Sequence, residues 1–155
     1  MNIFSGILIV FLAFAGMEFM AWFTHKYVMH GFMWYFHKDH HQKEEGWFEK
    51  NDVFFLIYAT PGILLILTGI AAGFDFKFFT GIGITLYGFT YFFVHDIFIH
   101  QRFKIFRNTQ HPYFLAIRKA HKAHHKVITK HDGTCYGMLL VPKKYYLQAR
   151  KILNR

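Results

Sequence analysis

Residues His25–His41 read HKYVMHGFMWYFHKDHH and contain histidines at positions 25, 30, 37, 40 and 41. Later in the chain the arrangement recurs, as HDIFIH at His95–His100 and HKAHH at His121–His125. Each half therefore carries an H-x4-H box followed by an H-x2-HH box. Ten of the 12 histidines fall into this duplicated pattern, which leaves out His111 and His131. We interpret the rest of the chain as a scaffold that brings the ten imidazoles together.

Imidazole is the commonest protein ligand for zinc, copper, iron and nickel. Residues at i, i+3 and i+4 share one helical face, so each H-x2-HH box can present three rings from one helical turn. The H-x4-H pairs lie about 140° apart on a regular helix. We therefore expect each pair at a helix end or on a π-bulge, a distortion that is frequent at functional sites. The candidate metal ligands are His25, His30, His37, His40, His41, His95, His100, His121, His124 and His125.

Ten ligands exceed what one ion takes, since zinc binds four and an octahedral iron binds six. Two metals with about five histidines each use the number naturally. No cysteine lies in the boxes, which argues against a zinc finger or an iron–sulfur cluster. Two other interpretations are scattered core or surface histidines and a metal-storage surface. The duplicated spacing argues against the first, and the absence of a low-complexity tract argues against the second.

The composition indicates an integral membrane protein of the all-α class. The chain is 54% hydrophobic, has 155 residues and suggests a single domain over residues 1–155. Three apolar runs are long enough to cross a hydrocarbon core of about 30 Å. We place these spans at residues 3–23, 53–73 and 78–98. An odd number of spans puts both histidine halves at the same membrane face.

The basic residues are unevenly distributed. Of the 18 Lys and Arg residues, none lies in residues 1–23, Lys77 alone lies in residues 53–94, and thirteen lie in residues 95–155. By the positive-inside rule the histidine-rich helical cap lies on the cytoplasmic side. This distribution favours a membrane protein, and we expect no nucleic-acid partner. Attraction to anionic lipid headgroups is sufficient to explain the basic face.

Three acidic residues are candidates to orient a ligand histidine through its second ring nitrogen. Glu18 is the one charge of the first span and lies seven residues before His25. A glutamate that is protonated or reaches toward the headgroups is an equal alternative for it. Asp39 and Asp96 lie within or beside a box. The polar stretch Gln42–Asp52 is interpreted as a solvated surface segment.

The four boxes resemble those of the membrane fatty-acid hydroxylase superfamily, and within it those of bacterial β-carotene 3-hydroxylases. The resemblance extends to HKYVMHG, to FEKND at Phe48–Asp52 and to the run from Tyr87 to Arg102, and it covers roughly Glu18 to Pro142. Relatives in the wider superfamily have four transmembrane helices, so four is the alternative to the three found here.

The resemblance implies a non-haem di-iron mono-oxygenase that binds two Fe ions through the ten box histidines. Such enzymes insert one atom of O2 at C3 of a β-ionone ring, converting β-carotene to β-cryptoxanthin and then zeaxanthin. It also implies a bacterial inner-membrane location. Zinc can occupy nitrogen sites built for iron, so it can replace iron in a purified sample.

The residues agree with that chemistry. An unactivated ring C–H bond requires a redox metal. We find no nucleotide-binding fingerprint, so electrons come from an external donor such as ferredoxin and its reductase, which would suit a basic face. Tyr87 and Tyr91 lie on one helical face before His95 and are candidates to line a substrate cavity between the spans. Two alternatives remain: a hydroxylase or desaturase of another membrane lipid, such as a fatty acyl chain or sterol, and a metal transport protein.

Overall fold

The computed structural model describes residues 1–42 and 46–154, and its regular elements over those residues are all helical. The all-α expectation is therefore confirmed. The elements are α1 (Ile3–Phe23), η1 (Thr24–Phe32), α2 (Trp34–His41), η2 (Lys50–Asp52), α3 (Val53–Ala71), α4 (Phe76–Tyr91), η3 (Phe92–Ile99), α5 (Pro112–His125) and α6 (Lys143–Leu153).

Three helical stretches of the described chain are long and apolar enough to cross a membrane, namely Ile3–Phe32, Lys50–Ala71 and Phe76–Ile99. They match the three predicted spans, 3–23, 53–73 and 78–98. The bounds agree within a few residues, except where η1 lengthens the first stretch and η2 lengthens the second. The first and third stretches continue as η1 and η3, both π-helices that carry an H-x4-H box. The first and third spans thus each deliver a pair of histidines at their ends.

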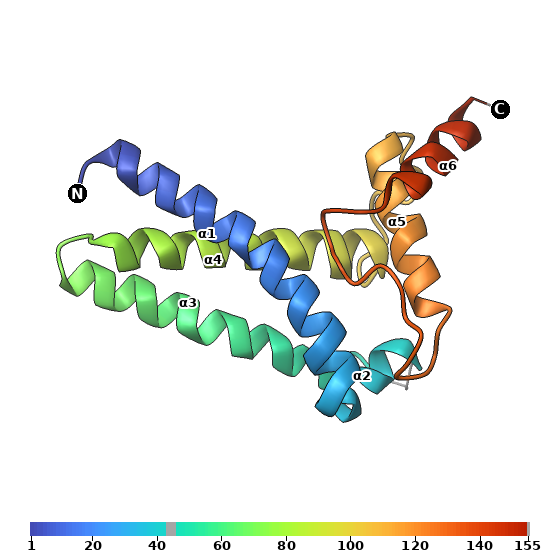
Figure 1. The fold of residues 1–155 in the computed structure, drawn as a ribbon, viewed down its shortest axis with the longest axis horizontal. Coiled ribbons are helices and arrows are strands. Elements are labelled where there is room, and N and C mark those ends of the chain that lie inside the picture. The colour runs from blue at the N-terminus through green and yellow to red at the C-terminus, as the bar shows by residue number, and fades with distance from the viewer. Residues whose placement is uncertain (43–45, 155) are drawn as a thin grey trace.

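The three long helices form the elongated part of the molecule (Figure 1). α3 and α4 run side by side as a hairpin, whose turn lies at the same end as the N-terminus, and α1 crosses over α4. Asp75 begins α4 by accepting a hydrogen bond from the backbone N–H of Lys77. This arrangement returns the end of α4 to the end of the bundle where α1 ends (Figure 1). His95 and His100 therefore lie at the same end as His25 and His30, and both pairs meet histidines of α2 and α5 there, as the sequence predicted.

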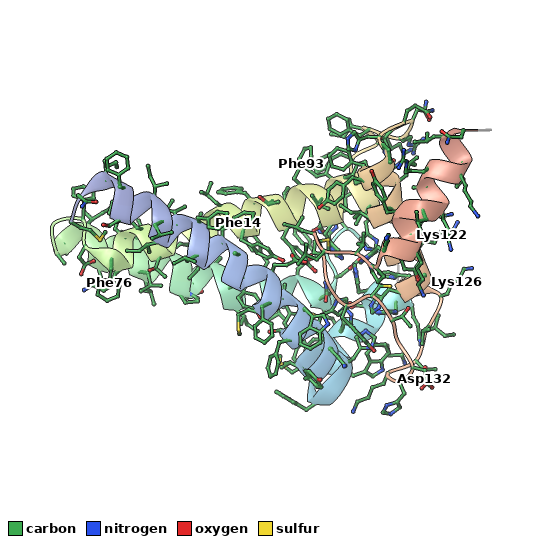
Figure 2. All side chains as sticks on the ribbon, turned by 45° about the horizontal axis from the view of Figure 1, so that its top comes forward. Phe14, Phe76, Phe93, Lys122, Lys126 and Asp132 are labelled. Carbon is green, nitrogen blue, oxygen red and sulfur yellow. The ribbon has the colours of Figure 1, made fainter. Side chains whose placement is uncertain are left out.

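At that end, α2, α5 and α6 form a cap over the bundle. α5 and α6 pack through small side chains, with Ala116, Ala120 and Ala149 buried around Tyr145. A second buried cluster joins Ile117 of α5 to the end of the bundle at Val94. Figure 2 shows Phe14 and Phe76 on the bundle, and Lys122, Lys126 and Asp132 at the opposite end on the cap. The apolar and charged parts of the molecule are therefore separate.

Candidate metal centre

The two π-helices solve the geometric problem of the H-x4-H boxes. In a π-helix the hydrogen bonds join residues five apart, so such residues lie on the same face. η1 contains His25 and His30 in this register, and the N–H of His100 donates to the carbonyl oxygen of His95 at 2.9 Å. The expected π distortion is thus confirmed for both boxes. Gly31 then leaves helical geometry, with φ −102° and ψ −124°, and the chain turns into α2.

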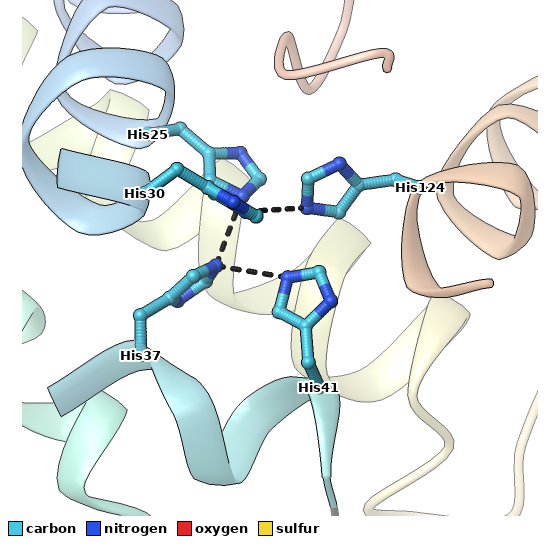
Figure 3. Close-up of side chains that lie close together, drawn as sticks. All are labelled: His25, His30, His37, His41 and His124. Carbon is cyan, nitrogen blue, oxygen red and sulfur yellow. Dashed lines mark hydrogen bonds between the residues drawn. The ribbon is translucent and has the colours of Figure 1, made fainter. Parts of the chain in front are cut away.

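Five histidines from η1, α2 and α5 converge in what we term group 1 (Figure 3). Their ligand-capable nitrogens lie within 4.8 Å of one another. The Nε2 of His37 lies 3.1 Å from the Nε2 of His25 and 3.2 Å from that of His41. The Nε2 atoms of His30 and His124 are 3.3 Å apart. The members of group 1 are His25, His30, His37, His41 and His124, all of them buried.

A second set of four histidines converges in what we term group 2. They come from α2, from η3 and the residue that follows it, and from α5. Its members are His40, His95, His100 and His121. The Nε2 atoms of His40 and His95 are 3.0 Å apart, and those of His100 and His121 are 2.8 Å apart. The tenth histidine, His125, packs its ring 4.5 Å from that of His121 and 4.7 Å from that of His40. All ten predicted ligands are therefore gathered in one region.

The H-x2-HH boxes are divided between the groups. His37 and His41 belong to group 1, whereas His40, on the same short helix, belongs to group 2. Likewise α5 gives His124 to group 1 and His121 to group 2. Each box therefore serves both groups, so α2 and α5 lie between them.

The hydrogen bonds define which nitrogen of each group 1 ring carries a proton. Every Nδ1 lies 2.7–3.1 Å from an oxygen that can only accept, so Nδ1–H is the donor. Four of these oxygens are backbone carbonyls of the segment between α5 and α6, and the fifth is the side-chain oxygen of Asn51. His25, His30, His41 and His124 donate to Tyr136, Lys130, Val127 and Thr134, respectively, and His37 donates to Asn51.

In a neutral imidazole with a proton on Nδ1, the Nε2 atom presents a lone pair. Five lone pairs lie within 4.8 Å of one another, and three pairs of Nε2 atoms lie only 3.1–3.3 Å apart. They repel unless a cation lies between them. The Nε2 of His125 is also buried, with no hydrogen-bond partner among the described residues. A bound metal ion would satisfy these nitrogens, so the residues fit a transition metal.

Protonation is the other way to relieve the repulsion, and burial opposes it. Desolvation is the main cause that lowers the pKa of His37 to about 2 and that of His124 to about 3. The same cause lowers the pKa of His125 to about 2 and that of His41 to about 4. These four imidazoles are therefore neutral at physiological pH, which is the form that binds metals.

Carboxylates support the histidines of group 2. The Nδ1 of His95 lies 3.2 Å from Asp96, one of the three acidic residues chosen from the sequence. The Nδ1 of His40 lies 2.7 Å from Glu49. Arg102 binds Asp96 at 3.0 Å and lies 3.8 Å from Glu49, so one guanidinium contacts both carboxylates. Group 2 is thus held by charged acceptors and group 1 by neutral ones.

The other two acidic candidates contact no imidazole of the described chain. Asp39 accepts a hydrogen bond from the backbone N–H of Lys50 at 2.6 Å. Glu18 accepts hydrogen bonds from the backbone N–H groups of Met138, Leu139 and Leu140 and from the hydroxyl of Tyr87. Glu18 therefore joins α1, α4 and the segment between α5 and α6.

Sequence reasoning missed Glu49 and Asn51. Both lie in the stretch interpreted as a solvated surface, whose residues 43–45 are outside the described residues. That interpretation is wrong for Glu49 and Asn51, which are half-buried and bond to His40 and His37, whereas Lys50 between them is exposed as expected. The sequence FEKND at Phe48–Asp52 contained the signal, because its carboxylate and amide groups can accept a hydrogen bond from an imidazole. Its resemblance to the family did not by itself indicate this role.

A cavity of about 360 Å³ lies among α1, α3 and α4 and ends at the histidines. Tyr87 and Tyr91, both chosen from the sequence, line it. His95 and Asp96 also line it, whereas no histidine of group 1 does so among the described residues. The ring of Tyr91 packs against that of His95, with centroids 4.9 Å apart. The apolar cavity therefore adjoins group 2.

Comparison with known proteins agrees with this geometry. Residues 10–142 match the family described as fatty acid hydroxylase. The chain belongs to this family. All ten box histidines lie within the matched residues, and so do the cavity and the segment that orients group 1.

Individual relatives carry a narrower name. The chain is 39% identical over 142 residues to a beta-carotene hydroxylase of Pantoea ananas, covering 92% of this chain and 81% of that one. It is 38% identical over 142 residues to the beta-carotene hydroxylase of Pseudescherichia vulneris, covering 92% and 80%. It is also 38% identical over 150 residues to a chloroplastic beta-carotene hydroxylase of Capsicum annuum, covering 92% of this chain but 46% of that longer one. No solved structure matches the chain.

Proposed function

We propose that residues 1–155 act as one membrane-embedded carotenoid hydroxylase, which inserts an oxygen atom from O2 at C3 of a β-ionone ring. The observation that carries the proposal is the apolar cavity, which ends at His95 beside converging imidazole nitrogens. The names of the bacterial relatives support β-carotene as the substrate, with β-cryptoxanthin and zeaxanthin as successive products.

We assign one iron to each group of histidines. Group 1 would hold one ion, and group 2 together with His125 would hold the other. Iron supplies the O2 activation and C–H cleavage that acid–base side chains cannot perform. Zinc would also fit an all-nitrogen site, so the metal that copurifies does not by itself identify the working metal.

The protein itself performs three further tasks in this reaction. The Nδ1 acceptors fix the orientation of the five group 1 rings and of His40 and His95, so that Nε2 points inward. The walls of the cavity exclude water from the reacting carbon, since its lining is mostly apolar and aromatic. Tyr87 and Tyr91 would lie beside the bound ring and position it toward His95.

Electrons are assigned to an external donor. The cap carries most of the basic residues of the chain, which favours an acidic carrier such as ferredoxin, reduced by its reductase. The same distribution favours a bacterial inner-membrane protein with its histidines on the cytoplasmic side.

The second candidate is hydroxylation or desaturation of another membrane lipid. An apolar cavity is compatible with an acyl chain or a sterol, and the histidine groups would be unchanged. Metal transport is less compatible with the geometry, because both groups lie at one end of the spans, whereas a transport site is expected near the bilayer midplane.

The test is expression in a bacterium that makes β-carotene, followed by chromatography and mass analysis of its pigments. We expect zeaxanthin from the parent protein and unchanged β-carotene from His40→Ala, at equal protein levels. His131→Ala is the matched control, because His131 is an exposed histidine outside both groups, and it should retain activity. A folded, iron-loaded and reducible parent that forms no hydroxylated carotenoid would refute the carotene assignment and favour another lipid.

A further inference from the structure

The glycines of α4 differ in what surrounds them. A Cβ atom on Gly81 would lie 2.7 Å from the carbonyl oxygen of Gly62, and one on Gly83 would lie 2.6 Å from that of Val10. Helix packing therefore requires glycine at both positions. Gly88 is different, because a Cβ atom there would point into open space. Apart from its chain neighbours and the backbone of its own helix, no heavy atom of the described residues lies within 4 Å of that position. Packing gives no reason for glycine at this position.

Gly88 lines the cavity, and the space that the cavity needs is a reason for glycine at this position. Other lining residues are also exposed on the outer surface of the bundle, where Phe55 is 58%, Ile63 53% and Phe89 69% exposed. The cavity therefore opens sideways between α3 and α4, within the apolar stretch Phe76–Ile99. Gly88 and His95 line this same cavity, so the space beside Gly88 is continuous with the space beside His95.

The size of the cavity limits what can enter it. Ligand pockets generally measure about 300–1,000 Å³, so a volume of about 360 Å³ is small. It suits one ring-sized end group and is too small for a forty-carbon polyene. The remainder of such a molecule would extend through the lateral opening among the exposed aromatic side chains and into lipid.

We propose that Gly88 forms the floor of a lateral opening from the bilayer, and that its missing side chain sets the size of the end group that reaches group 2. The proposal rests on the proposed function and deepens it, since it assigns the substrate class as a long apolar lipid that ends in a bulky ring. Gly88 is thereby a specificity-determining residue.

A size series at this position tests the proposal. Gly88→Ala should retain hydroxylation, whereas Gly88→Leu and Gly88→Trp should lower kcat/KM for β-carotene by at least about tenfold, as expected for extra groups in an apolar pocket. Iron content should be unchanged, because Gly88 is not one of the ten histidines. The controls are the same substitutions at Gly16, an exposed glycine of α1 that also has open space around it and does not line the cavity.

Modification after folding separates blockage from misfolding. Gly88→Cys is combined with Cys135→Ala, which removes the one native cysteine. The purified protein is then treated with methyl or benzyl methanethiosulfonate. The benzyl group should abolish most hydroxylation and the methyl group should not, whereas both should have no effect on Gly16→Cys. Full activity of the benzyl-modified protein, or of Gly88→Trp, would overturn the proposal.

Substrate protection provides a test without turnover. β-Carotene should slow disulfide formation between Gly88→Cys and benzyl methanethiosulfonate and leave that of Gly16→Cys unchanged, in protein that has received no reductant. Equal modification rates with and without β-carotene would refute the opening. If β-carotene protects Gly88→Cys but the iron-loaded and reducible parent protein forms no hydroxylated product, the proposed function alone is refuted, so the two can fail separately.

Discussion

Glu18 is the residue whose removal should most clearly separate the fold from the metal centre. One carboxylate oxygen accepts the backbone N–H groups of residues 138–140 at 2.8–3.1 Å, and the other accepts the hydroxyl of Tyr87 at 2.7 Å. The segment that Glu18 holds also provides the four carbonyl oxygens that orient His25, His30 and two further histidines of group 1. Glu18 therefore supports group 1 without contacting it.

The magnitude follows from these four bonds. Glu18→Gln keeps the shape of the side chain but replaces a charged acceptor with an amide that has one acceptor oxygen. A hydrogen bond to a charged group contributes about 1.5–3 kcal/mol, and a buried donor left without a partner costs about 1–3 kcal/mol. Since glutamine retains part of the network, we expect Glu18→Gln to lower the free energy of unfolding by about 2–4 kcal/mol. Glu18→Ala removes every acceptor, and we expect it to lower the free energy of unfolding by about 3–5 kcal/mol, as for a broken buried pair.

The assay is thermal unfolding in one detergent, together with the amount of bound metal per chain. At about 2–4 °C per kcal/mol for a chain of this size, Glu18→Gln should lower Tm by roughly 4–16 °C. Metal should fall from two ions per chain toward one, because only group 1 depends on the segment held by Glu18. Tyr87→Phe is the control: it removes one of the four bonds and should cost about 1.5–3 kcal/mol with both metals retained.

Two results would refute this reasoning. If Glu18→Gln has the Tm and metal content of the parent, the carboxylate does not hold the segment. If it loses both metals together, the segment does not support group 1 separately. A double-mutant cycle between Glu18→Gln and Tyr87→Phe should also give a non-zero coupling energy, because the two side chains share a hydrogen bond.

Three further predictions concern the supports, pH and the core. Glu49→Gln should weaken metal binding by about 10–100-fold, measured by competition with a chelator, because it removes the carboxylate 2.7 Å from His40; unchanged affinity would exclude that role. In the metal-free protein, the pKa of His41 falls to about 4 and that of His37 to about 2, so the unfolded state binds more protons below pH 6.5. Stability should therefore be full above pH 6.5 and fall toward pH 4, as measured by Tm against pH; a flat profile would contradict the burial of neutral imidazoles. Ile117→Ala should cost about 2–5 kcal/mol in unfolding measurements, because Ile117 is 1% exposed in the cluster beneath α5; a Tm like that of the parent would show that the cluster collapses around the gap.

The spans and the ten histidines could be predicted because their signals are local. Apolar length defines a membrane helix, and the i+5 spacing of His25 and His30 is incompatible with a narrow stripe on a regular helix. That spacing predicted either a helix end or a π-bulge, and the structure has the π-helix. The division of α2 between the groups could not be predicted from spacing. His37 and His40 are close on one helix, and only the positions of η1 and η3 decide which neighbours each ring meets.

Hydrogen-bond partners were the least predictable part of the site. Asp96 was found because it adjoins a box in sequence, and Glu49 was missed because its contact with His40 depends on the fold of the loop. The carbonyl oxygens that hold group 1 have no side-chain signature, so any sequence in the same backbone conformation could supply them. A search limited to residue types finds carboxylate supports and overlooks backbone ones.

The crossed assignment of the boxes has a consequence for assembly. Group 1 takes residues from η1, α2 and α5, and group 2 takes residues from α2, η3 and α5. Neither half of the duplicated sequence therefore completes a group by itself. The nitrogens of group 1 converge only when the end of the first span meets the cap, and those of group 2 converge only when the end of the hairpin meets it. Since a site that forms only in the folded state adds its binding free energy to folding, metal bound at either group stabilises the contact between the two halves of the chain.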